Sequence, residues 1–345
     1  MSKVIVLAGS PQAAKIDDFK ELLWRKVKIR KSLDEICHSV ELELPASERN
    51  KIKRHDKIVV RVFNPNYTDS DQKRRVTTVF IDEITDFVKP GQKSLTVLGR
   101  SPARDIIDST WSDTILGSAS FEDIAKKIAD KFKIPLARMP KDSKPTDPVP
   151  SFSWENESPW TKLLSEVDNE GFIFTSNEAG GLYLWKVATG VRKEGFRLSE
   201  GQNIRNIQTT ENGAGQYHTY IVKGGGKEKK ETDETCKNNR VLTINLTDLI
   251  VSEQVLKRRA LTEKLRRQEI KTVVTVSGWG LSDHQLKALG STGEKEVFWN
   301  PNFLIPVKIP SSNLDGNYLI SQVEQIADQS SFTSDITLVN PKVYA

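Results

Sequence analysis

The sequence predicts a β-rich α+β protein of several domains, in which an α/β unit is inserted between two similar small antiparallel β-barrels. Short segments that alternate apolar and polar residues fill the region 26–98 and return from about residue 198 onward. Between these regions the apolar residues follow a helical period instead. The 345 residues also exceed what most single hydrophobic cores accommodate. We therefore expect a first barrel domain at 1–103, an α/β domain at 104–197 and a second barrel domain at 198–345.

The first barrel is expected from five alternating segments separated by Pro, Asn, Asp and Gly. They read VKIRKSL, CHSVELELP, DKIVVRVFN, RRVTTVFIDEITDF and SLTVLGR. In the fourth segment, Asp82 and Asp86 share one strand face. A catalytic carboxylate pair would fit this arrangement. The polar outer face of a half-buried strand gives the same pattern, and it is the favoured interpretation.

The stretch SLTVLGRSPARDIIDSTW places Ser101 between a strand and a helical turn, as in the nucleophile elbow of a hydrolase. Such an elbow uses the backbone N–H of the next residue as an oxyanion-hole donor, and here that residue is Pro102, which has no N–H. Loss of this donor is expected to cost about 2.7–4 kcal/mol of transition-state stabilisation. The residues instead favour a short helix capped by Ser101, with Pro102 at its first position and Arg104 and Asp108 on one face.

The inserted unit is expected to begin with an amphipathic helix in SASFEDIAKKIADKF, which Ser120 caps. The proline-rich stretch that follows, IPLARMPKDSKPTDPVPSFSWENESP, is typical of an irregular connector. A second helix is expected in SPWTKLLSEVDNEG, where Ser158 caps, Pro159 takes the first position and Gly171 ends the helix. The segments FIFTSNE and LYLWKV flank AGG and predict a hairpin.

The second barrel is expected from IRNIQTT, YHTYIVKGGG and four closing strands in TVVTVSGWG, FLIPVKIP, YLISQVEQIA and FTSDITLVNP. Between them, GGGKEKKETDETCKNN has almost no apolar residue and predicts an exposed loop. It does not fit a phosphate-binding loop, because Lys227 is followed by Glu228. A helix over 252–269 places Leu261 and Leu265 on one stripe, apart from most of its basic residues.

The basic runs WRKVKIRK, QKRR and LKRRALTEKLRRQ, with a net charge of +5, raise the question of nucleic-acid binding. Acidic residues lie in or beside most of these runs, and no aromatic residues are interleaved with them to stack on bases. We therefore interpret the runs as solvated faces.

Neither a metal nor a cofactor is expected. Cys37 and Cys236 are isolated from each other. The four histidines show no ligand spacing: His38, His55, His218 and His284. The longest apolar runs, such as VIVLA, are far shorter than the ~18–20 residues of a membrane span, and no secretory leader precedes them. We therefore expect a protein that is made and kept in a cytoplasm, without membrane insertion.

Three groups of segments, in chain order, carry a family resemblance. The first is VFIDEITD followed by LTVLGRSPARDIIDST, and the second is SPWTKLLSEVDNEGFIFTSNEAGGLYLWK. The third combines RRALTEKLRRQEIKTVVTVSGWG, VFWNPNFLIPVKIP and LDGNYLISQVEQIADQSSFTSDITLVNP. Together they resemble the tail hub proteins of Mu-like phages, the baseplate protein P group, which is related to late control D proteins and to the N-terminal part of type VI secretion spikes. The resemblance covers about Leu23 to Pro341, although the stretch 281–297 is longer than a plain loop.

The resemblance implies a structural, non-enzymatic protein of a contractile phage tail baseplate. Three chains, each with two similar barrels, would form a ring that joins the tail tube to the central spike. The implied partners are two further copies of the chain, the tail tube protein, the central spike protein and other baseplate proteins, without recognition of a nucleic-acid sequence. The protein would reside in the virion after assembly in the bacterial cytoplasm. The resemblance also implies that Gly99 to Ser101 closes the first barrel and that Asp105 and Asp108 serve as capping or interface residues.

The helix over 252–269 contains six Lys or Arg residues against three Glu, so part of it is expected to face an acidic surface. The candidate interface residues are Arg258, Arg259, Arg266 and Arg267. Two alternatives stay open: a tail-associated peptidoglycan hydrolase that uses Asp82, Glu83 or Asp86, and a barrel that binds single-stranded nucleic acid.

Overall fold

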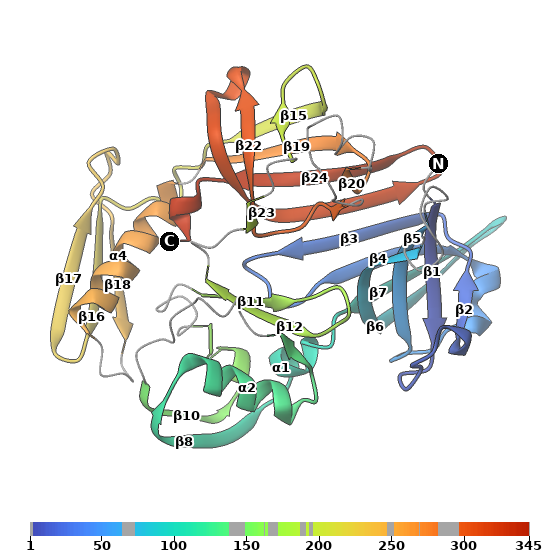
Figure 1. Cartoon of the computed structure of the whole chain (residues 1–345), viewed down its shortest axis with the longest axis horizontal. Helices are drawn as coiled ribbons and strands as arrows, with labels where there is room; N and C mark the ends of the chain where they lie inside the picture. The colour runs from blue at the N-terminus through green and yellow to red at the C-terminus, as the bar shows by residue number, and fades with distance from the viewer. Residues whose placement is uncertain are drawn as a thin grey trace.

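The structure, a computed structural model, is dominated by β-strands (Figure 1). It describes residues 3–63, 73–137, 149–161, 163–164, 172–186, 191–192, 196–246, 252–268, 270–281 and 297–344. Its topology combines one large sheet with several small ones. The β-rich class predicted from the sequence is therefore confirmed.

One large sheet runs through both β-rich regions of the chain. Its strands follow the order β15-β19-β24-β23-β3-β4-β7-β6-β5-β1-β2. Beside this path β22 pairs with β23, and β13 and β14 pair with β22. In the first region the bounds are β1 Lys3–Gly9, β2 Phe19–Leu22, β3 Lys26–Ser32, β4 Ser39–Pro45, β5 Lys57–Phe63, β6 Lys73–Lys89 and β7 Gln92–Arg100. In the second region they are β13 Val191–Arg192, β14 Leu198–Ser199, β15 Ile204–Thr210, β19 Lys271–Ser277, β22 Phe303–Ile309, β23 Leu314–Asp328 and β24 Phe332–Val339.

The other elements form smaller layers around this sheet. The inserted unit contains β8 Trp111–Ala119, β9 Leu136–Ala137, β10 Val149–Glu157, β11 Phe172–Ser176 and β12 Leu182–Lys186, with α1 Arg104–Asp108 and α2 Phe121–Lys131. An outlying sheet of β16 Thr219–Gly224, β17 Lys227–Thr232 and β18 Val241–Leu246 packs against α4 Glu253–Gln268 at the left of Figure 1. The short strands β20 Gly280–Leu281 and β21 Val297–Phe298 pair with each other.

The two β-rich regions repeat the same strand order. The first half reads β3-β4-β7-β6-β5, and the second half reads β15-β19-β24-β23-β22. When the five strands of each half are numbered in chain order, both halves have the same spatial order, 1-2-5-4-3. In each half the last two strands form a long antiparallel hairpin that the second and third strands flank. We call residues 26–100 the first half and residues 204–339 the second half.

The pairing register of the two hairpins is also repeated. Phe80 pairs with Arg100 in the first hairpin and Leu319 with Val339 in the second, and the pairs that follow toward the turn keep this offset of 239 residues. Each hairpin also has a register shift at the same place, after the next pair. Because such bulges set how a strand bends, the two halves share one backbone framework.

Each half encloses its own apolar cluster, and the inserted unit encloses a third. Val27, Ile29 and Leu42 belong to the first cluster, and strands β3 and β4 bury every second residue as the alternation predicts. The second half buries Val274 and Val276 from β19 in the same way. In the inserted unit, α2 begins with a capping box formed by Ser120 and Asp123, and its apolar face lines the third cluster.

The halves are joined edge to edge by antiparallel pairing of β23 with β3. We call this pairing the internal junction. The pairings of the described residues therefore form one open path instead of two closed rings. Alternation in the sequence specifies which face of a strand is buried, but it does not specify which edges meet.

Several local predictions are confirmed by the described residues. The four closing strands lie at β19, β22, β23 and β24, and FIFTSNE and LYLWKV form the β11–β12 hairpin. The basic helix is α4, close to its expected bounds. The second helix of the insert lies partly outside the described residues, with 159–161 and 163–164 helical.

Other local predictions are wrong. The expected exposed loop after Gly224 contains strand β17, which pairs along its length with β16. The proline-rich connector contains β9 and β10, and β10 pairs with β8, which the sequence did not indicate. In α4, Leu256 and Ala260 are buried against β16, whereas Leu261 is 40% exposed. In each case the segment pairs with or packs against another part of the chain that local composition does not reveal.

Candidate functional site

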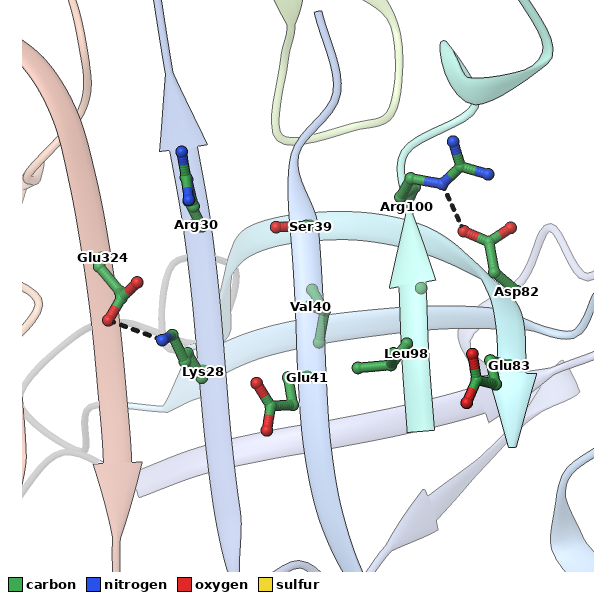
Figure 2. A pocket seen from close by; sticks show the side chains of 11 residues that line it. Lys28, Arg30, Ser39, Val40, Glu41, Asp82, Glu83, Leu98, Arg100 and Glu324 are labelled. Carbon is green, nitrogen blue, oxygen red and sulfur yellow. Dashed lines mark hydrogen bonds and ion pairs between the residues drawn. The ribbon is translucent and has the colours of Figure 1, made fainter. Parts of the chain in front are cut away.

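A charged hollow of about 420 Å³ lies on one face of the main sheet, across strands β23, β3, β4, β7 and β6. Figure 2 shows acidic and basic side chains along these neighbouring strands. The lining residues are Lys28, Arg30, Ser39, Val40, Glu41, Asp82, Glu83, Leu98, Gly99, Arg100 and Glu324. The hollow spans the internal junction, so it is built by both halves of the chain.

Several charges in and beside this hollow form ion pairs between neighbouring elements. Lys28 Nζ lies 3.0 Å from Glu324 Oε1, which ties β3 to β23. Arg100 Nε lies 2.6 Å from Asp82 Oδ2, and Arg104 donates to the same carboxylate. Figure 2 shows the contact between Lys28 and Glu324 and the contact between Arg100 and Asp82 as dashed lines. These contacts stabilise the sheet and hold the carboxylates of Glu324 and Asp82 beside cations.

The Arg100 guanidinium also donates to Asp108, with Nη2 2.5 Å from Oδ2. This hydrogen bond holds the pKa of Asp108 below its ordinary value, against a smaller opposing effect of burial. A general acid needs a carboxyl group whose pKa is raised toward neutrality. The environment of Asp108 does the opposite, so this cluster suits structural charge pairing.

The carboxylates of the expected outer strand face are not brought to one shared partner. Asp86 accepts from Arg49 Nε at 3.1 Å, away from the two arginines that hold Asp82. Glu83 accepts from the hydroxyl of Thr85 at 2.8 Å. Asp82 and Glu83 line the hollow beside Leu98, whereas Asp86 lies opposite Leu95, which is buried in the core. The expectation that Asp82 and Asp86 share one strand face is therefore wrong, because the register shift after Ile81 interrupts the alternation of faces.

Ser101 is buried and does not cap a helix. Its Oγ lies 2.6 Å from Ser176 Oγ and accepts from the backbone N–H of His38 at 3.2 Å. The short helix α1 begins at Arg104, with Ala103 as the N-cap residue. The expected capping role is therefore wrong, because the hydroxyl is used to tie β7 to the inserted unit.

The expected contact between Arg104 and Asp108 is also replaced. Arg104 pairs with Asp82 and Asp105, and Asp108 pairs with Arg100. The (i, i+4) spacing predicts the two side chains on one helix face. However, α1 has only five residues, and its charged side chains contact Asp82 of β6 and Arg100 of β7. Charged groups from the sheet therefore compete successfully for both side chains.

His38 does not form a base for Ser101. Its Nδ1 lies 3.2 Å from Thr77 Oγ1. Burial lowers the pKa of the His38 ring well below its ordinary value, and the charge of Lys31 adds to this effect. The ring is therefore neutral and packed between strands.

Lys31 lies at a buried contact among all three parts of the molecule. Its Nζ donates to Asn300 Oδ1 at 2.8 Å, and Asn300 Nδ2 donates to Glu178 Oε1 at 3.1 Å. Lys31 is on β3, Glu178 follows β11 in the inserted unit, and Asn300 follows β21. Burial lowers the pKa of Lys31 to about 8, and the charge of Glu178 opposes this. We call these residues the three-way contact.

The three-way contact was not identified from the sequence, although one signal was present. Val27, Ile29 and Lys31 occupy alternate positions of one strand, so Lys31 stands where an apolar residue is expected. A lysine on the inward face of a strand needs a buried partner.

The basic helix α4 packs on its own chain. Arg259 Nη2 lies 3.0 Å from Glu263 Oε1, and Arg267 Nε lies 3.3 Å from Glu263 Oε2. Arg266 stacks over the ring of Tyr344, with 5.4 Å between the guanidinium carbon and the ring centroid. Arg258 is half-buried, as the other three are. Their predicted role at an interface between chains stays a prediction.

Neither a metal site nor a membrane span is found in the described part of the chain. Within it, no group of three or more His, Cys, Asp or Glu residues could hold a metal ion. None of its helices has both the length and the hydrophobicity needed to cross a bilayer.

The fold relates the chain to solved structures, whereas no family model and no curated protein sequence matches it. The 43 kDa tail protein of prophage MuSo2 from Shewanella oneidensis superposes with a TM-score of 0.77 at 19% identity, over 99% of each chain. A tail protein from Neisseria meningitidis gives a TM-score of 0.73 at 15% identity, over 98% of this chain and 96% of that one. This chain has the fold of phage tail proteins.

The tail-protein fold extends to a secretion system. A type VI secretion component from E. coli, described as structurally similar to bacteriophage T4 tail proteins, gives a TM-score of 0.58 at 9% identity, over 99% of this chain and 76% of that one. The expected likeness to Mu-like tail proteins and to type VI spikes is therefore confirmed at the level of the fold.

Proposed function

We propose that the chain is a structural hub of a contractile phage tail baseplate, which forms a homotrimeric ring and joins the tail tube to the central spike. The observation that carries the proposal is the repeat of strand order and register within a chain that has the tail-protein fold over its full length. Three copies of a chain with two equivalent halves present six equivalent units. Such a ring can therefore match a three-fold spike to a six-fold tube.

The proposed hub consists of the units 1–103, 104–197 and 198–345. The first and last units would line the ring, and the second would lie outside it. Its partners would be the tail tube protein, the central spike protein and other baseplate proteins. The hub would act in the virion tail after assembly in the host cytoplasm and would need no cofactor.

The contacts around Asp82, Asp108 and Ser101 support a role without catalysis. Each of these groups is held by a neighbouring strand or by the inserted unit. None is arranged as a nucleophile with a general base among the described residues. Paired polar groups of this kind help to hold a fold in one geometry, which an assembly component requires.

The test is the mass of the purified chain in solution, measured by light scattering at micromolar concentration. The expected mass is three times the 38.9 kDa of the chain, with more surface buried per contact than the ~1,200–2,000 Å² of an ordinary interface. A monomer at every concentration would overturn the hub.

The same measurement tests the proposed role of α4. Reversal of charge at Arg258 and Arg259 (R258E/R259E) is expected to weaken the trimer at low salt, and ~1 M salt is expected to have a similar effect on the wild type. A trimer that the reversal leaves intact would remove α4 from the interface and leave the hub proposal standing.

A further inference from the structure

The repeat leaves one strand edge unused in each half of the chain. Along residues 322–327, β23 pairs with β24 on one edge and with β3 on the other. The equivalent residues of β6, 83–88, pair with β7, and no strand among the described residues pairs with their other edge. We call 83–89 the free β6 edge.

The strand equivalent to β3 is unused in the same way. β3 pairs with β4 on one edge and with β23 on the other. Its counterpart β15 pairs with β19, and within the described part of the chain its second edge pairs with no strand. We call 204–210 the free β15 edge. The two free edges are thus the counterparts of the two edges that meet at the internal junction.

Exposure along the free β6 edge points to a missing neighbour. Phe87 is 42% exposed and Val88 is 67% exposed, near the end of a 17-residue strand. Natural proteins normally cover or blunt an exposed edge with apolar side chains, because such an edge recruits other strands. All residues of 85–89 are exposed, as are Gln208, Thr209 and Thr210 on the free β15 edge.

We propose that the free β6 edge of one copy pairs antiparallel with the free β15 edge of the next copy, in the register of the internal junction. The proposal rests on the ring that was proposed above and specifies the contact by which its copies join. The sheet would then continue from chain to chain as it continues from half to half.

The repeat fixes the register of this contact. Gly99 and Leu338 hold equivalent places in the two hairpins, and they pair with Val40 and Thr272. Val40 pairs in turn with Ile29, and Thr272 pairs with Thr209. Ile29 of β3 is therefore equivalent to Thr209 of β15, and two residues earlier Val27 is equivalent to Ile207.

At the internal junction Val27 lies opposite Ala327, and Ala327 is the counterpart of Val88. The proposed contact therefore places Val88 of one copy opposite Ile207 of the next. An apolar pair in that position would cover Val88, which is more exposed than the other large apolar side chain of the edge, Phe87.

The other opposed pairs are compatible with close pairing. In the same register Asp86 faces Thr209, Lys89 faces Asn206, and Phe87 faces Gln208. No two like charges lie directly opposite each other. The internal junction is different, because Lys28 and Glu324 form an ion pair there at 3.0 Å. The contact between copies is thus less dependent on charge than the internal junction.

The contact is head-to-tail, because the two edges that meet belong to different halves. Contacts of this kind form a ring when the rotation between copies closes and a filament when it does not. In the proposed trimer, the ring closes after three copies.

The test is disulfide trapping with the variant Val88→Cys/Ile207→Cys. Directly opposed residues of an antiparallel pair lie about 4.5–5.5 Å apart at Cα, which a disulfide spans. Both native cysteines, Cys37 and Cys236, are buried, so background cross-linking is low. On a non-reducing gel, mild oxidation is expected to shift the band from the monomer to a covalent trimer, and reductant is expected to reverse the shift.

Three controls define the contact. Neither Val88→Cys nor Ile207→Cys alone is expected to cross-link, whereas a mixture of the two single variants is expected to give a dimer. The pair Asp86→Cys/Ile207→Cys moves one cysteine two residues along the strand, beyond the reach of a disulfide. This variant is expected to stay at the level of the single variants.

The outcomes separate this inference from the hub itself. A trimer by light scattering without cross-links in Val88→Cys/Ile207→Cys would overturn the edge contact and leave the hub proposal intact. Equal cross-linking in the shifted pair would overturn the register. Cross-linking of Val88→Cys alone would indicate a symmetric contact and would overturn the head-to-tail arrangement. Absence of any trimer would overturn both proposals.

Discussion

The two halves of the main sheet share a framework of five strands but differ in the connection between the first two. In the first half, β3 and β4 are joined by residues 33–38. In the second half, residues 211–270 separate β15 from β19 and include the β16–β18 sheet and α4. The strand order and the hairpin register are nevertheless the same. The long hairpin, and not the connection, therefore specifies the framework, because a surface connection accepts long insertions at small entropic cost.

The halves also differ at the position that faces the bulge. Gly99 pairs with Ile81 in the first half, and Leu338 pairs with Ile320 in the second. A Cβ atom on Gly99 would lie 2.8 Å from the carbonyl oxygen of Phe80, whereas Leu338 is buried in the core of its half. One backbone position thus serves close strand approach in the first half and core packing in the second.

The largest expected effects come from replacing Leu338 and Gly99 with alanine. Leu338→Ala is expected to lower the free energy of unfolding by about 2–5 kcal/mol through the cavity it leaves. Gly99→Ala is expected to lower it by about 1–3 kcal/mol, since the backbone of β6 must move. Urea denaturation measures both.

The control for these two variants is Gly213→Ala, because the nearest atom to a Cβ at this position would be the side-chain oxygen of Gln216, 3.8 Å away. Its expected change is close to zero. A Gly99→Ala variant as stable as this control would contradict the close approach of the two strands.

A second prediction concerns Lys31, which is buried on β3 of the first half. The equivalent residue of the second half is Glu211, which follows β15 and is exposed. The pKa of Lys31 is lowered to about 8 by burial, whereas an unfolded lysine keeps its proton to about pH 10.4. Between these values the unfolded chain binds more protons, so the free energy of unfolding rises with pH, by about 3 kcal/mol in full.

Denaturation of the wild type and of Lys31→Met from pH 7 to 11 tests this difference. Lys31→Met is expected to lose the rise above about pH 8, and Lys26→Met, a half-exposed lysine on the same strand, is expected to keep it. The same slope in all three proteins would show that Lys31 is ionised in the folded state as it is in the unfolded state.

The smallest expected effects concern the two aspartates of β6. Asp82→Asn weakens the bonds from Arg100 and Arg104 and is expected to cost about 1–2 kcal/mol, since these groups are partly exposed. Asp86→Asn loses one exposed pair with Arg49 and is expected to cost under ~1 kcal/mol. Thermal and urea denaturation give both values. Peptidoglycan turnover by the wild type that disappears in Asp82→Asn would contradict a purely structural role.

Much of the fold could be predicted from local patterns. The alternation in VKIRKSL and VELELP gave the strands and their buried faces, and the capping residues Ser120 and Asp123 gave the start of α2. The sequence failed where structure depends on a distant strand. β1 was not expected, although it pairs along its whole length with β5, and the charged segment of β17 resembled a loop.

The candidate site was predictable in part. The exclusion of Ser101 as a nucleophile followed from Pro102. The faces and partners of the β6 carboxylates did not follow from the strand period, because the register shift after Ile81 places Asp82 and Asp86 on different faces. Arg104 was expected to face Asp108 within one helix, but a carboxylate on β6 lies closer. Lys31 occupies a position of its strand where an apolar residue is expected, and only the fold shows that Asn300 Oδ1, 269 residues away, accepts a hydrogen bond from its Nζ.

The sequence by itself determined the strands at 26–32 and 39–45, the helix at 121–131 and which of their faces are buried, because side-chain period and capping act within a few residues. Only the tertiary structure decided which edges meet: β23 with β3, β1 with β5, and β10 with β8. The physical reason is that strand edges join through backbone N–H and C=O groups, which are the same in nearly every residue. Partner choice therefore depends on how the buried faces pack and on which edges that packing brings together.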